Sequence, residues 1–337
     1  MIAEEKPDIT MVVPFFNEEK YLSLMINSIT SQDLGVFHAE IIFVDGNSTD
    51  NSVAVIEKIT NCPSIILRII NNPKKTTPCG LNIGIHAAKS DIISFGSAHA
   101  IYPPVYLKSS IELLSREDIV GGMCTKFITL DDTYISKAMS MLYLSRMGAG
   151  IRNNYHDSES KYTNTVFGGC FKRSVFDTIG LYNEQLDRGQ DIDFNSRAIQ
   201  AGFHILHHPD LNSTYILKTN PKDFWGRAYK TGRYLAAAFQ RNHHSVGLLH
   251  ALPMFLVFYF VFLSVVATLH TFEFWMIIPF ITYLILLILN MLSLLSSHNF
   301  LPSLLTIPIF SSYHLVYGMG TIIGIVETII NIKAKNE

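Results

Sequence analysis

The chain has 337 residues, a formal net charge of -2 and 48% hydrophobic residues, which suffices for one large domain and an additional segment. The near-zero net charge excludes a bulk electrostatic attraction to nucleic acid, so we expect no nucleic-acid partner. The charges are concentrated in residues 1–246, which hold all but two of the 26 Lys and Arg and all but three of the 28 Asp and Glu. This shift predicts a soluble domain over 1–215, a connecting region over 216–246 and a membrane domain over 247–337.

The start of the chain and its cysteines favour the cytoplasm for the soluble domain. The four cysteines are scattered, without a CxxC or Cys/His metal spacing, so reduced thiols are expected. Residues 1–8 are charged and lack an apolar core, so no cleavable signal peptide is expected and the polypeptide should begin in the cytoplasm.

Strands and helices are predicted to alternate through residue 95. Short β-branched runs predict strands over Ile9–Val13, Glu40–Val44, Ser64–Asn71 and Asp91–Phe95. Apolar residues at helical spacing predict helices over Glu18–Thr30, Asp50–Ile59 and Leu81–Ala88. This alternation predicts an α/β fold with a parallel, doubly wound sheet.

Polar residues follow the first two predicted strands. Asn17 and Glu18 come after the first, and Asp45 and Asp50 lie at and beyond the end of the second. Because ligands bind beyond the carboxyl ends of strands in an open parallel sheet, these side chains should line one crevice. Such carboxylates suit either a nucleoside, whose base and ribose carry donors, or a divalent metal that itself holds phosphates.

Two motifs carry a resemblance to a known family. Val13-Pro14-Phe15-Phe16-Asn17-Glu18-Glu19 and Val44-Asp45-Gly46-Asn47-Ser48-Thr49-Asp50 resemble the opening motifs of the inverting family 2 glycosyltransferases, which have the GT-A fold. The resemblance implies a GT-A-like, mostly parallel sheet. It also implies that the nucleotide-sugar pocket is lined by Pro14, Phe16, Asn17, Glu18, Asp45 and Asp50. The alternative is that Pro14 and Gly46 only shape turns.

The linker before the fourth strand is similar to that of the same family, with Leu81-Asn82-Ile83-Gly84-Ile85 as its core. The resemblance implies that Asn82 lies on the nucleotide side. Lys74 or Lys75 would then meet a pyrophosphate, and the alternative for both is an ordinary solvated loop.

The segment after the fourth strand departs from the family pattern. Family 2 enzymes usually carry Asp-x-Asp there, whereas this chain reads Ser97-Ala98-His99. It is closest to an Asp-Ala-His variant in bacterial exopolysaccharide glucosyltransferases of the succinoglycan type. The resemblance implies that Ser97 faces the nucleotide sugar and that His99 ligates Mg²⁺ or Mn²⁺ held mainly by the diphosphate. Because the Asp is missing, the alternative is a catalytically inactive membrane protein that only binds nucleotide sugars.

The catalytic base is expected in the segment Leu186–Arg197. The resemblance assigns Asp191 as the base that takes the acceptor hydroxyl's proton, while Asp193 is predicted to be a carboxylate of the helix's first turn. The alternative for Asp191 is a helix cap. Gly168, Gly169 and Cys170 match the segment beneath the donor sugar and acceptor.

A basic amphipathic helix is predicted over Lys222–Arg241, with aromatic residues on one face and Lys and Arg on the other. This pattern is typical of a helix that lies in the cytoplasmic membrane interface. The alternative is a helix packed on the soluble domain. The resemblance implies that its aromatic and basic residues, including Trp225 and Arg233, border the acceptor.

Three apolar segments follow, and spans are predicted at about 247–269, 274–295 and 301–330. The third contains Pro302 and Pro308, and three full spans would leave Lys333 and Lys335 outside, against the positive-inside tendency. A re-entrant third segment therefore stays open.

Together these features predict a multi-pass glycosyltransferase of the bacterial inner (cytoplasmic) membrane. It should move a sugar from a nucleotide-sugar donor, a UDP-sugar being favoured, to a lipid-linked or growing saccharide acceptor in cell-surface polysaccharide synthesis. A divalent metal and membrane lipids are its other expected partners.

Overall fold

The computed structural model describes residues 6–59, 62–145, 147–148, 159–186, 189–241, 248–295 and 300–336. The chain forms two compact units, the first of Met1–Ile128 with Asn154–Ile216 and the second of Thr129–Asn153 with Leu217–Glu337. The chain therefore enters the second unit twice, and each unit is described by itself.

The first unit is built on an eight-stranded sheet in the order β3-β2-β1-β4-β9-β6-β10-β8. Strands β3, β2, β1 and β4 run parallel, β10 is parallel to β6, and β9 is antiparallel to both of its neighbours. The predicted α/β fold with a mostly parallel sheet is confirmed. The strands are β1 (Ile9–Phe15), β2 (Ala39–Asp45), β3 (Ile65–Asn71), β4 (Ile92–Phe95), β6 (Ile119–Gly122), β8 (Lys161–Thr163), β9 (Phe167–Lys172) and β10 (Ile205–His207).

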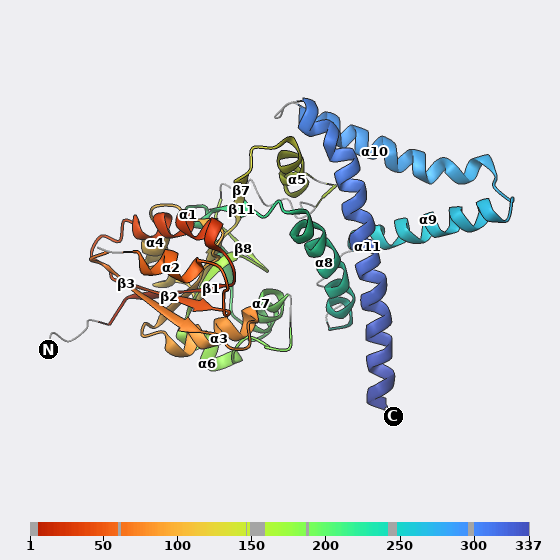
Figure 1. Ribbon diagram of the computed structural model, residues 1–337. Coiled ribbons are helices and arrows are strands. Elements are labelled where there is room, and N and C mark those ends of the chain that lie inside the picture. The colour runs from red at the N-terminus through yellow and green to blue at the C-terminus, as the bar shows by residue number, and fades with distance from the viewer. Residues whose placement is uncertain are drawn as a thin grey trace. The chain divides into compact units, whose positions relative to one another are not determined.

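Helices cover both faces of this sheet (Figure 1). One face carries α1 (Glu19–Thr30), α2 (Ser52–Glu57) and α4 (Tyr106–Leu114), and the other carries α3 (Thr77–Ala87), α6 (Arg173–Ile179) and α7 (Gln190–Gln200). This is why β1 and β2 read as continuous apolar runs rather than as alternating ones. A smaller sheet joins β5 (Ala100–Ile101), β11 (Ser213–Leu217) and β7 (Cys124–Thr129).

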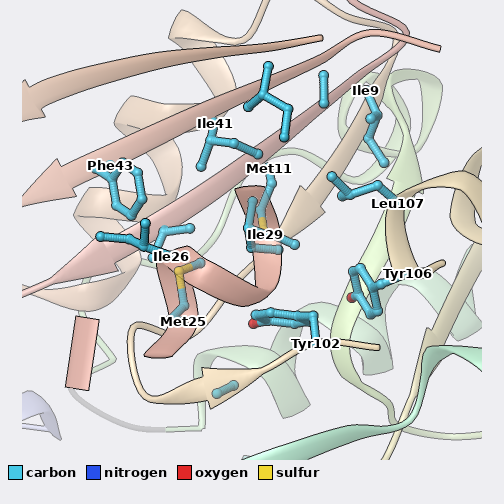
Figure 2. Packing of buried hydrophobic residues seen from close by; sticks show 14 of the residues in the cluster. Ile9, Met11, Met25, Ile26, Ile29, Ile41, Phe43, Tyr102, Tyr106 and Leu107 are labelled. Atoms are coloured by element: carbon cyan, nitrogen blue, oxygen red, sulfur yellow. The ribbon is translucent and has the colours of Figure 1, made fainter. Parts of the chain in front are cut away.

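The core under α1 shows why this helix forms where it does. Met25 and Ile29 are buried at helical spacing and face Met11 and Ile41 of the sheet (Figure 2). Truncating a buried side chain of this kind to Ala costs about 2–5 kcal/mol. The apolar face of α1 therefore determines both its position and its register on the sheet.

Helix α3 lies unusually close to the sheet because of one glycine. A Cβ atom at Gly84 would collide with the side chain of Val12 on β1, so the helix and strand can approach this closely only without a side chain there. The helix begins at Thr77, earlier than the predicted Leu81, because Pro78 is accommodated in its first turn. Its N-terminus thereby reaches the ends of β1 and β2.

The second unit is helical. It contains α5 (Tyr134–Leu144), α8 (Pro221–Arg241), α9 (Leu252–Thr268), α10 (Ile278–Leu295) and α11 (Phe300–Asn336). The indole Nε1 of Trp225 on α8 donates to Ser312 of α11 at 3.1 Å, and Arg233 forms an ion pair with Glu327 at 2.6 Å. Because the partners on α11 advance as α8 advances, the two helices run parallel.

Glycines let α8 and α11 approach each other closely. A Cβ at Gly232 would collide with the carbonyl of Tyr317, one at Gly320 with that of Tyr229, and one at Gly324 with that of Arg233. Small residues of this kind allow backbones to come into contact. The apolar face predicted for α8 is therefore covered by α11.

A polar cluster ties the end of α5 to the apolar helices. Ser145 donates to Asn290 of α10 at 2.5 Å. His314 of α11 donates through Nε2 to the Met147 carbonyl at 2.9 Å and accepts at Nδ1 from Tyr283, also at 2.9 Å. His314, the polar residue of the third apolar segment, is thus satisfied by its neighbours.

Two helical segments, Phe274–Leu295 and Phe300–Ile330, have the length and apolar composition to cross a membrane, and α9 is apolar but only 17 residues long. These helices are identified by their length and apolar composition alone. The predicted spans therefore remain a prediction, and the start of the first one, at 247, lies outside the described residues.

Candidate active site

A cavity of about 310 Å³ opens at the carboxyl ends of β1, β2 and β4 in the first unit. This is the edge where ligands bind in open parallel sheets. Of the predicted site residues, seven line the cavity: Pro14, Phe16, Glu18, Lys75, Ser97, His99 and Gly168. The structure thus brings together residues from the first motif, the segment after β4 and the start of β9.

Asn17 and Asp45 organise the rim of this cavity. Asn17 adopts a left-handed backbone (φ 53°) and its side-chain oxygen accepts the Thr49 backbone N–H at 2.8 Å. Asp45 accepts the backbone N–H of Ser48 at 2.9 Å. The first bond connects the loops after β1 and β2, and the second closes a turn within the loop after β2.

Asp50 joins the starts of two helices. Its carboxylate accepts the backbone N–H of Ser52 at 3.0 Å and that of Glu19 at 3.1 Å, at the beginnings of α2 and α1. Burial tends to raise the pKa of this carboxyl, but hydrogen bonds from Ser52 and Glu19 outweigh that effect and hold it below its ordinary value of 3.8. In this structure Asp50 supports the loops, and a nucleotide-contacting role remains a prediction.

Asn82 is buried and directed toward the segment that precedes α7. Its amide donates to the Tyr182 carbonyl at 2.9 Å and to Glu184 at 3.1 Å, and its oxygen accepts the Tyr182 N–H at 3.0 Å. Glu184 also accepts from Lys74 at 2.7 Å. Both predicted residues of the linker, Asn82 and Lys74, are therefore engaged with one segment.

Lys75, by contrast, lines the cavity together with Thr76 and Thr77 at the N-terminus of α3. Lys75 has a left-handed backbone (φ 62°), which turns the chain directly into the helix. A cation beside a helix N-terminus favours an anion such as a phosphate. The two threonines were not among the predicted site residues, although Pro78 is typical of the first turn of a helix and indicates that a helix begins beside them.

His99 links the first motif to a distant strand. Its Nδ1 lies 3.3 Å from Oε1 of Glu18, and its Nε2 lies 2.7 Å from the hydroxyl of Tyr215 on β11. Tyr215 was not predicted to belong to the site, because no motif near it in the sequence indicates a contact with His99. Among the residues that the structure describes, no three His, Cys, Asp or Glu side chains form a metal-binding group, so His99 and Glu18 are a two-donor set.

Gly168, Gly169 and Cys170 form the predicted segment at the start of β9. Gly168 has a φ of 60°, lines the cavity, and its carbonyl accepts from the Tyr106 hydroxyl. Cys170 is fully buried between Ser94 and Ser110, with its sulfur 3.1 Å from each hydroxyl oxygen, and burial raises the pKa of its thiol. Gly169 is constrained by the Phe171 ring. Of the three, only Gly168 lines the cavity.

Asp191 and Asp193 both lie in the first turn of α7, the place predicted for Asp193. Asp191 is exposed, and its charge adds to burial in raising the pKa of nearby Tyr182. Asp193 forms an ion pair with Arg197 at 3.1 Å. The two carboxylates thus have different surroundings, while the role of Asp191 as base stays a prediction. The two preceding residues, 187 and 188, lie outside the described part of the chain.

Trp225 and Arg233, predicted to border the acceptor, belong to the second unit. Both are engaged with α11, through Ser312 and Glu327. Their predicted role toward an acceptor is untested.

A mostly parallel α/β sheet with a charged pocket at its carboxyl edge is the architecture of nucleotide-binding enzymes. The model of Glycosyl transferase family 2 matches residues 10–180, about half of the chain. The chain belongs to this family and is a glycosyltransferase.

The chain is also similar to two named relatives and to one solved structure. A dolichyl N-acetyl-alpha-D-glucosaminyl phosphate 3-beta-D-2,3-diacetamido-2,3-dideoxy-beta-D-glucuronosyltransferase of Methanococcus voltae is 25% identical over 77% of this chain and 81% of its own length. The succinoglycan biosynthesis protein ExoA of Rhizobium meliloti is 22% identical over 72% and 74%. A mannosyltransferase of Pyrobaculum calidifontis, solved with GDP-Man and Mn²⁺, has a TM-score of 0.60 and 15% identity over 95% and 88%, which shows a shared fold.

Proposed function

We propose that this enzyme transfers a sugar from a nucleotide-sugar donor, with a UDP-sugar favoured, to a lipid-linked saccharide in cell-surface glycan synthesis. The observation that carries the proposal is the cavity at the ends of β1, β2 and β4. It combines Lys75 and the N-terminus of α3, which suit a diphosphate, with the Glu18 carboxylate and His99. The Methanococcus relative is named for transfer to a dolichyl-phosphate sugar, which supports the class of acceptor.

In the proposed reaction the acceptor hydroxyl gives its proton to the Asp191 carboxylate as its oxygen attacks the anomeric carbon. The bond from that carbon to the diphosphate breaks on the opposite face, so the configuration inverts. Lys75 and the first N–H groups of α3 stabilise the charge on the departing nucleoside diphosphate. A divalent cation held at His99 would supply further neutralisation of that charge.

We also propose that the second unit attaches the enzyme to the cytoplasmic membrane. Helices α9 and α10 expose large apolar side chains, among them Phe255, Phe258, Ile281, Ile285 and Leu289, and large exposed apolar patches mark membrane or protein contacts. Both helices run crosswise to α11 (Figure 1). In this proposal α9 and α10 form a hairpin that crosses the bilayer.

We propose a different location for α11, at the membrane surface, because α11 packs against the charged helix α8. Residues 312–327 of α11 pack along α8, which carries Lys222, Arg227, Lys230 and Arg233. A charged side chain at the bilayer centre costs roughly 2.5–3.5 kcal/mol or more. The α8–α11 pair is therefore better suited to the membrane surface on the cytoplasmic side, with the exposed apolar side chains of α11, such as Met319 and Val326, toward the lipid.

A donor screen tests the function. Membranes containing the full-length protein are supplied with UDP- and GDP-sugars, and released nucleoside diphosphate and label in the lipid extract are measured with and without Mn²⁺. We expect release and lipid labelling to rise together for one donor and to require Asp191. Release without lipid labelling would contradict the lipid-linked acceptor, and donor binding without release would contradict transferase activity.

A further inference from the structure

The Glu18–His99 pair has the spacing of two ligands of one metal ion. Donors bound at about 2.1 Å on adjacent positions of a divalent ion lie roughly 3 Å apart, and Glu18 Oε1 lies 3.3 Å from His99 Nδ1. Both side chains line the cavity beside Ser97. Resting on the nucleotide-sugar site proposed above, we propose that Glu18 is a metal ligand and supplies the carboxylate that position 97 lacks.

Tyr215 orients His99 for this role. Its hydroxyl lies 2.7 Å from His99 Nε2, and its ring packs edge-on against the imidazole, with the centroids 4.8 Å apart and the planes at 87°. When Nε2–H donates to the Tyr215 oxygen, the lone pair of Nδ1 is directed to the side where Glu18 lies. Metal-ligating histidines are commonly held through their other ring nitrogen in this way.

The charge of the pair matches a cation. The Glu18 side chain is only 8% exposed and that of His99 is 17% exposed, so a cation bound by both would be largely shielded from water, where attraction between opposite charges is strong. One oxygen and one nitrogen donor suit Mn²⁺ better than Mg²⁺, which prefers oxygen alone. Two protein donors leave most coordination positions to other ligands, so tight binding should require a diphosphate.

The experiment measures Mn²⁺ binding to the purified full-length protein, by the loss of the free-ion electron paramagnetic resonance signal, with UDP present and absent. Glu18→Gln and His99→Gln should each weaken binding at least about tenfold in the presence of UDP, and Tyr215→Phe, which removes only the orienting contact, roughly tenfold. Glu19→Gln is the matched control. The Glu19 carboxylate accepts from Asn51 instead of facing His99, so this variant should bind Mn²⁺ like the wild type.

A rescue makes the test specific. Ser97→Asp in the Glu18→Gln background should restore most of the lost Mn²⁺ affinity, because it returns one anionic oxygen beside His99. Ser97→Asp alone should tighten Mn²⁺ binding, and this result can be obtained even if Glu18→Gln does not fold. Equal Mn²⁺ affinity of Glu18→Gln and Glu19→Gln would overturn the proposal, as would UDP binding that Mn²⁺ never strengthens. Failure to bind UDP under any condition would instead contradict the nucleotide-sugar site itself.

Discussion

Asn82 and Tyr182 exchange two hydrogen bonds across a separation of 100 residues, with the Asn82 amide donating to the Tyr182 carbonyl and the Tyr182 N–H returning to the Asn82 oxygen. The pair joins α3, whose N-terminus lines the cavity, to the segment that leads to α7 and Asp191. This contact connects the donor side of the site to the element that carries the proposed base.

Asn82→Ala should therefore destabilise the protein more than it weakens nucleotide binding. The change leaves the Tyr182 backbone groups without their partners in a buried place, at a cost of about 1–3 kcal/mol each. Thermal unfolding of the full-length protein in detergent should shift downward by several degrees, with UDP affinity little changed. Asn183→Ala, which removes an exposed bond to the Gln185 N–H, is the control and should have a small effect. A large loss of UDP affinity at unchanged stability would show instead that Asn82 contacts the nucleotide.

The two neighbouring lysines provide a matched pair for the diphosphate. Lys75→Ala should weaken UDP binding roughly tenfold, because hydrogen bonds to charged groups contribute about 1.5–3 kcal/mol and Lys75 lines the cavity. Lys74→Ala should change it little, since Lys74 is paired with Glu184. Calorimetric titration with UDP measures both. Equal losses would mean that general positive charge, rather than position in the cavity, binds the nucleotide.

Asp191→Asn should lower turnover by about 10²–10⁴-fold, the usual contribution of a general base, while donor affinity stays near that of the wild type. Asp193→Asn is the control, because Asp193 is already paired with Arg197, and it should retain most activity. Initial rates with the donor identified in the screen, together with UDP affinity, decide the matter. If Asp191→Asn turns over normally, another group accepts the proton.

Asp50 predicts a pH dependence of stability. Its pKa in the folded protein is lowered below 3.8, so its hydrogen bonds contribute stability that is fully present above about pH 4 and is lost as the pH falls through the folded value. The difference in unfolding midpoint between wild type and Asp50→Asn should therefore be large at pH 6 and shrink near pH 3. Asp177→Asn, an exposed carboxylate, should show little difference at either pH. A constant difference between wild type and Asp50→Asn would contradict this assignment.

The membrane proposal predicts that the C-terminus and the catalytic domain share one side. A cysteine at Lys335 should react with an impermeant maleimide only in inside-out vesicles, and one at Thr271, between α9 and α10, only in vesicles of the opposite orientation. The wild-type protein is the control, because it shows how much maleimide reacts with the four native cysteines. Reaction of Lys335→Cys from the side of Thr271→Cys would mean that α11 crosses the bilayer after all.

The sequence predicted most of the fold because its signals are local. The β-branched runs of β1 and β2 and the apolar face of α1 each show in a few adjacent residues, and the structure has these elements within a few residues of the predicted bounds. Gly168, Ser97 and His99, which the sequence assigned to the site, line the cavity, while their roles remain predictions.

What the sequence did not predict depends on contacts between distant positions. Tyr215 meets His99 only because β11 pairs with β5. The polar character of Asn82 gave no sign of whether it faces a nucleotide or Tyr182. Likewise, hydropathy described α11 as apolar but did not show that α8 covers it, because one segment's composition does not identify its neighbour.

Gly84 affects the cavity from outside it, through the packing of α3 on β1. Gly84 is not among the residues that line the cavity. The absence of a side chain over Val12 nevertheless determines how close α3 lies to the sheet, and therefore where Thr77 at its N-terminus meets the cavity. Position 84 thus acts as a spacer. A methyl group there would collide with Val12 and push α3 away from the sheet, so the shape of the cavity depends partly on a residue that does not line it.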